Sequence, residues 1–212
     1  MKAIVVGATG LVGSELLKLL VEDSVFSEIV VYGRRPPQCE HRKLSFIQGE
    51  LGELNHHGDE LKGDVYFCCL GTTLKAAGSQ ENFRRVDFHG VVSFGRLAFN
   101  HKAKKFLVVS SSGADSQSKL FYPRVKGEAE KALKDLKLNS LVFFRPGFLV
   151  GERKEKRTTE KMVVSSFGFF RHVMPIKLSK SFFTEVAILA QRMLEEAKSE
   201  ASGLEIFEAR DI

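Results

Sequence analysis

Tyr122 and Lys126 stand four residues apart in the stretch YPRVK, a spacing that places both side chains on one face of a helix. The pair suits the reduction of a carbonyl group, because hydride transfer produces an alkoxide that needs a proton and a phenol can donate it. An ordinary phenol, with a pKa near 10, is poorly matched to neutral pH, and a neighbouring ammonium favours the phenolate. The sequence therefore predicts Tyr122 as a proton donor and Lys126 as its partner.

Three consecutive serines, Ser110 to Ser112, end an apolar segment shortly before YPRVK. A hydroxyl at the end of a strand in this place could hydrogen-bond the oxygen of the substrate. The run alone does not decide which hydroxyl faces the substrate, so Ser111 and Ser112 are both candidate catalytic residues.

The stretch GATGLVG, from Gly7 to Gly13, follows an apolar run and precedes a helical pattern that begins at Leu11. At the head of a βαβ unit, Gly7 permits a tight turn, Gly10 lets backbone N–H groups approach a pyrophosphate, and Gly13 lets the helix pack close to the strand. The helix N-terminus supplies further donors and partial positive charge. The spacing is one residue longer than the usual dinucleotide fingerprint, but its context favours a nucleotide site over an ordinary turn.

The end of the second apolar segment distinguishes between the two nicotinamide dinucleotides. NAD enzymes generally place an Asp or Glu there, where the carboxylate binds the ribose 2′-hydroxyl. This chain has Arg34 and Arg35 instead, and two guanidiniums could hold a 2′-phosphate through charge-assisted hydrogen bonds. We therefore expect NADPH rather than NADH, and the alternative is a pair of solvated loop arginines.

Short β-branched segments alternate with longer helical patterns, which is typical of a doubly wound parallel sheet of the α/β class. We expect a single domain, because no linker or repeat divides the 212 residues. Residues 1–145 would form a cofactor-binding core, and residues 146–212 a substrate-side cover with the last helix and strand. The expected strands are 2–6, 28–32, 44–48, 64–70, 105–110, 140–144 and 204–207, and the expected helices are 11–22, 80–99, 123–136 and 184–197.

Composition is that of a soluble globular protein, with 43% hydrophobic and 27% charged residues. The net charge of +6 suits nucleic acid, an anionic membrane or a phosphorylated small molecule, and the lack of a recognition motif argues against nucleic acid. No apolar run reaches the roughly 20 residues of a membrane-spanning helix, and no signal peptide is evident. The expected location is therefore cytoplasmic. The cysteines (Cys39, Cys68 and Cys69) and scattered histidines match neither a disulfide framework nor a metal site.

Six motifs together carry a family resemblance: GATGLVG, YGRR, CCLGTT (Cys68 to Thr73), SSSGAD, YPRVKGEAE and FRPGFL. In this order they resemble the atypical short-chain dehydrogenases, and in particular the Tat-interacting-protein-type oxidoreductases of that superfamily. The resemblance covers nearly the whole chain. It implies a Rossmann fold that binds NADPH, with the proton donor and its lysine partner at the two positions named above.

The resemblance also implies which residues contact the cofactor. It places the pyrophosphate at the glycine stretch, the 2′-phosphate at the two arginines, the adenosine ribose beside the CCLGTT motif and the nicotinamide near FRPGFL, with one further basic contact. The implied cofactor-binding residues are Gly7, Thr9, Gly10, Leu11, Val12, Arg34, Arg35, Leu70, Gly71, Thr72, Tyr122, Lys126, Leu149 and Arg157.

Two positions differ from related sequences. The wider superfamily often has an asparagine in the helix expected at 80–99, where it helps to anchor a proton-relay water, and this chain has Asp87. In the family that the chain resembles, lysine stands at the third serine, which mildly favours Ser111 as the substrate contact. We predict an NADPH-dependent oxidoreductase of a small, apolar carbonyl compound, monomeric or homodimeric. The alternative is an NADPH-sensing module that binds a protein partner with little or no turnover.

Overall fold

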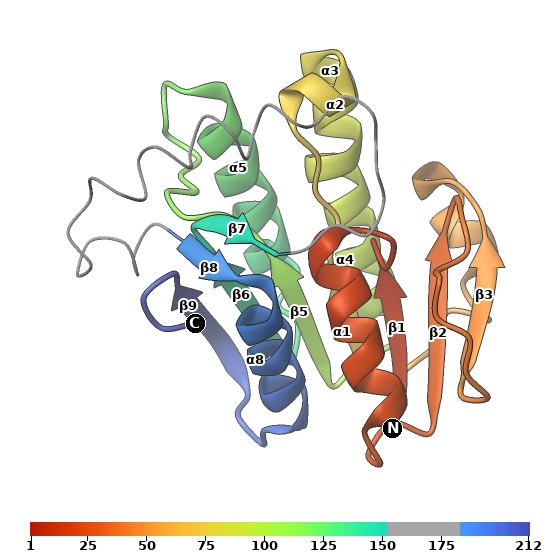
Figure 1. Ribbon diagram of the computed structural model, residues 1–212. Helices are drawn as coiled ribbons and strands as arrows, with labels where there is room; N and C mark the ends of the chain where they lie inside the picture. The colour runs from red at the N-terminus through yellow and green to blue at the C-terminus, as the bar shows by residue number, and fades with distance from the viewer. Residues whose placement is uncertain (152–182) are drawn as a thin grey trace.

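A parallel sheet of seven strands forms the centre of the computed structural model, which describes residues 1–151 and 183–212 (Figure 1). The strand order is β3-β2-β1-β4-β5-β6-β9, and every pairing in this sheet is parallel. The doubly wound α/β fold expected from the sequence is thereby confirmed. The strands are β1 (Lys2–Val6), β2 (Glu28–Gly33), β3 (Leu44–Gln48), β4 (Val65–Cys68), β5 (Lys105–Val109), β6 (Ser140–Arg145) and β9 (Gly203–Glu208).

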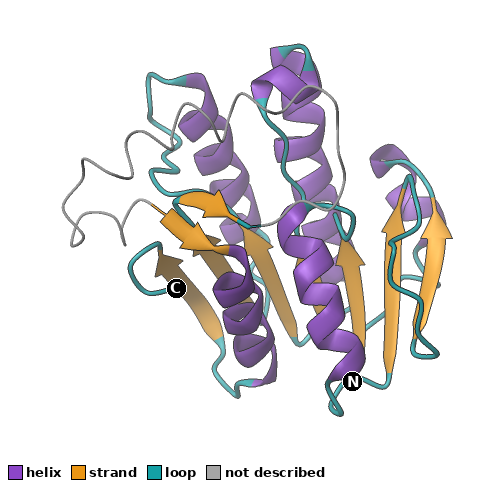
Figure 2. Ribbon diagram, viewed as in Figure 1, coloured by secondary structure: helices purple, strands orange, loops and turns teal. Residues whose placement is uncertain are grey.

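Helices cover both faces of this sheet, which explains why the central strands are apolar on both sides. Helices α1 (Leu11–Glu22) and α8 (Val186–Lys198) lie together on one face, and α4 (Val91–Asn100) and α5 (Phe121–Asp135) lie on the other (Figure 2). Successive residues of a strand point to opposite faces. Phe67 of β4 therefore joins the core beneath α1 and α8, whereas Tyr66 joins the core beneath α4 and α5.

The helix expected over residues 80–99 is divided into pieces. Helix α3 (Gln80–Arg84) leads into the π-helical turn η2 (Arg85–Gly90), which continues as α4, and the short helix α2 (Leu74–Ala77) precedes them. Gly78 ends α2 in the left-handed conformation, with φ of 76°, and the Ser79 hydroxyl caps the start of α3. The apolar periodicity predicted a helix but not the π turn.

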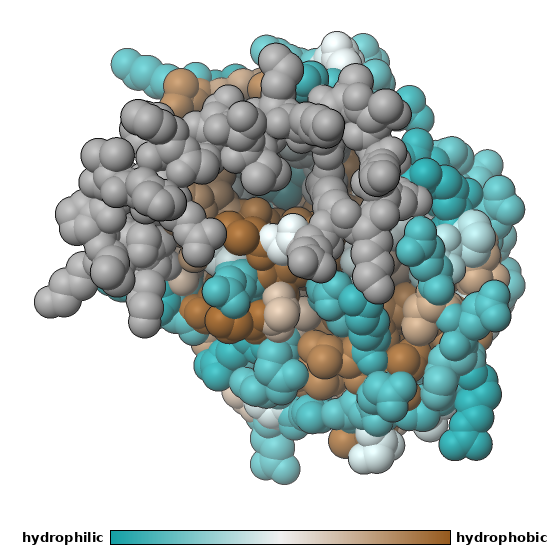
Figure 3. Space-filling model, in the orientation of Figure 1, coloured by the Kyte–Doolittle hydropathy of each residue, from teal (hydrophilic) through white to brown (hydrophobic). Residues whose placement is uncertain are grey.

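Besides α2, three short elements in the described part of the chain were not predicted. They are the 3₁₀ helix η1 (Leu51–His57) and the strands β7 (Phe148–Val150) and β8 (Phe183–Glu185), which pair in parallel as a separate two-stranded sheet. Because residues 183–185 are extended, α8 begins at Val186 rather than at residue 184. Figure 3 shows apolar surface around the place of β7. Within the two described ranges, no helix is both long and apolar enough to cross a membrane.

Candidate functional site

The loops that carry the candidate residues lie at one edge of the sheet, where the carboxyl ends of β1, β2, β4 and β5 meet (Figure 1). The strand order reverses beside β1, whose two neighbours are β2 and β4. In open α/β sheets, ligands bind outside the carboxyl ends of the strands at this kind of switch point. The fold therefore brings together the glycine stretch, the arginine pair, the CCLGTT motif and the serines.

The glycine stretch forms a tight turn between β1 and α1. Gly7 has a φ of 78°, and a Cβ there would overlap the carbonyl group of Cys69, the residue that directly follows the neighbouring strand β4. The N–H of Gly10 donates to the Gly7 carbonyl oxygen at 3.0 Å, and Gly10 forms the exposed N-cap of α1 without a side-chain cap. The following N–H groups of the first turn have no intrahelical acceptor. These donors, with the positive end of the helix dipole, suit the phosphates of a dinucleotide.

Arg34 and Arg35 directly follow β2, and both are exposed. Within residues 1–151 and 183–212, neither guanidinium has an ion pair or a side-chain hydrogen bond. Their ten N–H donors are thus available, and guanidinium groups bind phosphate in a bidentate geometry. The chemistry of this donor set fits a 2′-phosphate at the end of β2.

The residues after β4 contact a buried carboxylate. The N–H of Thr72 donates to Asp87 Oδ2 at 2.9 Å, and Asp87 Oδ1 lies 2.7 Å from Lys126 Nζ. Gly71 lies beside this pair: a Cβ there would be 3.8 Å from both charged groups. The loop from Leu70 to Thr72 is therefore joined through Asp87 to the helix that carries the predicted proton donor.

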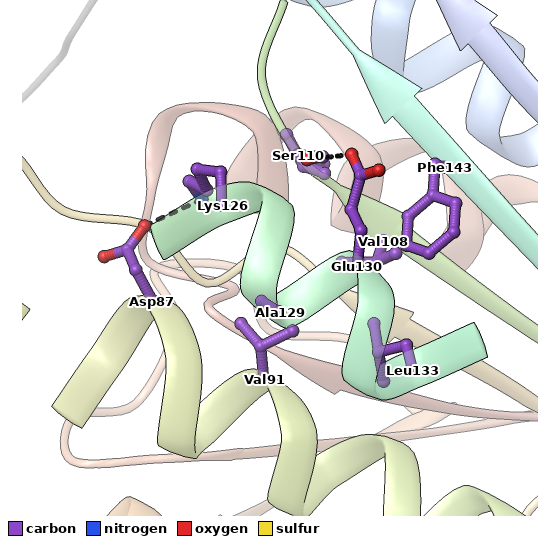
Figure 4. Close-up of a pocket in the computed structure, with 10 residues that line it drawn as sticks. Asp87, Val91, Val108, Ser110, Lys126, Ala129, Glu130, Leu133 and Phe143 are labelled. Carbon is purple, nitrogen blue, oxygen red and sulfur yellow. Dashed lines mark hydrogen bonds and ion pairs between the residues drawn. The ribbon is translucent and has the colours of Figure 1, made fainter. Parts of the chain in front are cut away.

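Tyr122 and Lys126 lie in the first half of α5, as the spacing predicts. Tyr122 is 37% exposed and packs against the ring of Phe83, with ring centroids 5.5 Å apart. The side chain of Lys126 is only 6% exposed and points toward Asp87 (Figure 4). Burial lowers the pKa of the Lys126 ammonium, but the Asp87 carboxylate together with Tyr122 and Cys68 outweighs burial, so the net direction of the pKa is upward. Lys126 is thus a buried, charged lysine.

The three serines have different environments. The Ser110 hydroxyl, which is buried, donates to Glu130 Oε1 at 2.6 Å. The Ser111 hydroxyl donates to the Ser112 carbonyl oxygen at 3.2 Å, whereas the exposed Ser112 hydroxyl has no partner in the described part of the chain. Ser110 has a structural contact, and Ser111 and Ser112 stay the two candidates for binding a substrate oxygen.

Glu130 belongs to a buried charge network that sequence reasoning missed. Arg145, at the end of β6, donates to Glu130 through Nε at 2.9 Å and Nη2 at 2.6 Å, and its Nη1 donates to Glu208 at 2.8 Å. These hydrogen bonds raise the pKa of Arg145. Glu130 follows Lys126 by four residues, so both face the same side of α5. This spacing is the signal that could have indicated two buried charges.

One residue that the resemblance assigns to the nicotinamide lies on the small two-stranded sheet. Leu149, on β7, is 37% exposed and pairs with Thr184 of β8. The end of β7 comes close to the glycine stretch, since a Cβ on Gly151 would be 3.6 Å from Leu11 Cδ1. Arg157 lies outside the described residues. No cluster of three or more metal-ligating side chains occurs in the parts of the chain that the structure describes.

The sheet, the glycine turn at the switch point and the donors around it define a dinucleotide-binding Rossmann fold. The model of the HIM1 family matches residues 60–179, so the chain belongs to the HIM1 family. A second family model, the NAD-binding domain of semialdehyde dehydrogenase, matches residues 2–83. The resemblance stated from the motifs is confirmed at this level.

Relatives and solved structures agree with this class. The chain is 34% identical to protein HTATIP2 of Rattus norvegicus, over 98% of this chain and 86% of that protein. It is 30% identical to protein FMP52-1, mitochondrial, of Scheffersomyces stipitis, over 100% of this chain and 97% of that protein. The structure of MoeE5 in complex with UDP-glucose and NAD superposes with a TM-score of 0.76 at 18% identity, covering 98% of this chain and 75% of that chain.

The cytoplasmic location expected from the sequence is contradicted by these relatives. The FMP52 proteins of Scheffersomyces stipitis, Meyerozyma guilliermondii and Candida albicans, which are 30%, 34% and 32% identical, are named mitochondrial. The expectation rested on the lack of a recognisable secretory signal. Such a lack carries no information about import into an organelle by another route.

Proposed function

We propose that the protein is an NADPH-dependent oxidoreductase that reduces a small, apolar carbonyl compound. The observation that carries this proposal is the placement of Tyr122 and Lys126 on one face of α5, with Lys126 beside Gly71 of the loop that follows β4. When bound, NADPH supplies the hydride. Tyr122 donates the proton to the carbonyl oxygen, Lys126 holds positive charge beside the phenol, and Ser111 or Ser112 hydrogen-bonds the same oxygen.

The cofactor site of the proposal comprises the turn after β1, the arginines after β2 and residues 70–72. The first-turn N–H groups of α1 would bind the pyrophosphate, and Arg34 and Arg35 would bind the 2′-phosphate. Apolar side chains near the site support an apolar substrate: Leu120, directly before α5, is 71% exposed, and Phe148 and Val150 of β7 are 53% and 43% exposed.

Fluorescence titration with NADPH and with NADH tests the cofactor part of the proposal. Arg34→Ala and Arg35→Ala should each weaken NADPH binding about tenfold and leave NADH binding unchanged, because only NADPH carries the 2′-phosphate. Arg42→Ala is a matched control, because Arg42 is equally exposed but precedes β3 at the opposite edge of the sheet. Equal losses for both dinucleotides would refute the arginine assignment.

Turnover of aldehydes and ketones tests the chemical part. Tyr122→Phe removes one hydroxyl and should abolish turnover while NADPH affinity stays within about twofold, because the phenol acts on the substrate rather than on the cofactor phosphates. Undiminished turnover in this variant would exclude Tyr122 as the proton donor. Cofactor binding without turnover of any carbonyl compound would favour the NADPH-sensing alternative.

A further inference from the structure

Asp87 connects two parts of the candidate site that lie on different elements. It occupies the π-helical turn η2, and its side chain is fully buried. Oδ2 accepts the N–H of Thr72 at 2.9 Å, and Oδ1 lies 2.7 Å from Lys126 Nζ (Figure 4). Within the described residues, Oδ1 has the Lys126 ammonium as its ion-pair partner and no other polar contact. π-helical turns inside longer helices occur frequently at functional sites.

The surroundings of Lys126 leave Asp87 as its counter-charge. The titratable groups that face the ammonium are Asp87 from η2, Tyr122 from its own helix and Cys68 from β4. Burial raises the pKa of the Cys68 thiol to about 12, so Cys68 is neutral over the working range. Glu130, one turn further along α5, is bound by other partners. Without Asp87, the buried ammonium would have no carboxylate beside it among residues 1–151 and 183–212, and burial disfavours the charged form of lysine.

An asparagine could not make the same two contacts. Both carboxylate oxygens of Asp87 face positive or donor groups, namely the N–H of Thr72 and the ammonium of Lys126. An amide has one oxygen and one NH₂ group, so either Thr72 or Lys126 would face a donor. The acid at this position is therefore a specific requirement of the arrangement.

We propose that Asp87 is a positioning residue, whose carboxylate keeps Lys126 charged and fixes the lysine against the loop from Leu70 to Thr72. The loop that follows β4 and the helix that carries Tyr122 are thereby held in one arrangement. The catalytic consequence rests on the proposed function. The consequences for charge and stability do not, because they concern contacts present without cofactor or substrate.

The first test measures folding stability against pH for Asp87→Asn. In the wild type, the pKa of Lys126 is raised on folding, so its contribution to stability is complete below the unfolded value of 10.5 and constant from pH 7 to 9. In the variant, we expect the folded pKa of Lys126 to fall below the unfolded one. The unfolded state then binds more protons, and the folding equilibrium constant should rise by up to about tenfold per pH unit relative to wild type. Denaturant titrations at several pH values measure this slope.

Two control variants isolate the lysine. Glu81→Gln makes the same acid-to-amide change at an exposed position on α3, and it should keep the wild-type pH dependence. The double variant Asp87→Asn/Lys126→Met removes the ammonium and should abolish the new slope. If Asp87→Asn alone does not fold, the double variant should restore folding, because the uncompensated buried charge is gone. A pH dependence of Asp87→Asn that equals wild type, or an unfolded double variant, overturns the proposal.

Turnover provides a second readout that a purely structural role would not change. In Asp87→Asn, kcat should decline as pH rises from 7 to 9, because Lys126 loses its proton, whereas wild-type kcat should not show this decline. Refutation of the proposed function and of the Asp87 proposal are distinguishable. If the wild type shows no turnover, the proposed function is refuted and the stability test still applies. If the difference in folding stability between Asp87→Asn and the wild type does not change with pH, the role of Asp87 is overturned whatever the turnover.

Discussion

Gly13→Ala should destabilise the protein, although the same change stabilises most helices. Gly13 lies in the first turn of α1, where a Cβ would overlap the Gly7 carbonyl oxygen and lie 2.8 Å from the Cα of Ala8. These atoms belong to the backbone of the turn and cannot rotate away. Relief therefore requires that α1 move away from β1, which also carries the first-turn donors away from the phosphates.

The expected size follows from two opposing effects. Overpacking at a buried position costs about 1–3 kcal/mol, and replacing glycine by alanine inside a helix recovers about 0.5–1 kcal/mol. With mid-range values of about 2 and about 0.75 kcal/mol, the net loss is about 1 kcal/mol, and for a chain of 212 residues this lowers Tm by about 2–4 °C. Thermal unfolding followed by circular dichroism measures the shift.

Two further glycines separate packing from binding. Gly52→Ala makes the same substitution in η1, where no atom lies within 4 Å of the added Cβ, and it should not lower Tm. At Gly10 the nearest contact of a Cβ is the Gly7 carbonyl oxygen at 3.2 Å, which a shift of a few tenths of an ångström relieves. Gly10→Ala should therefore keep Tm near wild type and weaken NADPH binding more than tenfold. An unchanged Tm for Gly13→Ala would refute the close-packing argument.

Three other outcomes are expected. Glu130→Ala should cost about 3–5 kcal/mol in a urea titration, because it deprives the Arg145 guanidinium of a buried partner, and a loss below 1 kcal/mol would contradict this. A hydrogen bond from a backbone N–H lowers the pKa of the Asp64 carboxyl group below 3.8. The carboxylate therefore contributes to stability above this pH, and the contribution is lost as the pH falls through the folded pKa. In Asp64→Asn, the free energy of unfolding should fall less steeply with decreasing pH than in the wild type. At pH 8 a thiol reagent should modify the half-buried Cys39 before Cys68, whose pKa burial raises to about 12, and equal rates would contradict this.

The fold was predictable because its signals are local. Each strand of the main sheet is a short apolar run, and the predicted ends agree with the structure within two residues, the largest difference being at β4, where Cys69 and Leu70 leave the strand to form the site loop. Helix α1 begins and ends at the predicted residues. The elements that were missed, such as η1 and β7, are short and carry no periodic pattern. The residues directly after β4 have the composition of a strand, so the sequence alone extends the strand too far. The hydrogen bond to Asp87 that holds this loop comes from a residue distant in sequence.

The candidate site was predictable where one motif contains the chemistry. The positions of Tyr122 and Lys126 on one helix face follow from their spacing. The partners of the charged groups were not predictable, because Asp87 and Arg145 come from elements far along the chain and meet α5 only in the folded protein. A buried Lys or Glu cannot be recognised from its own type, since most such residues are exposed.

Helix α5 is held on its core-facing side by two buried ion pairs of opposite polarity. Lys126 meets the carboxylate of Asp87 on η2, and one turn later Glu130 meets the guanidinium of Arg145 on β6. Buried pairs add little net stability compared with apolar residues, but breaking one leaves an uncompensated charge at a cost of about 3–5 kcal/mol. Any rotation of α5 about its axis would break both pairs together. The two pairs therefore fix the rotation of the helix, and with it the direction in which Tyr122 presents its hydroxyl.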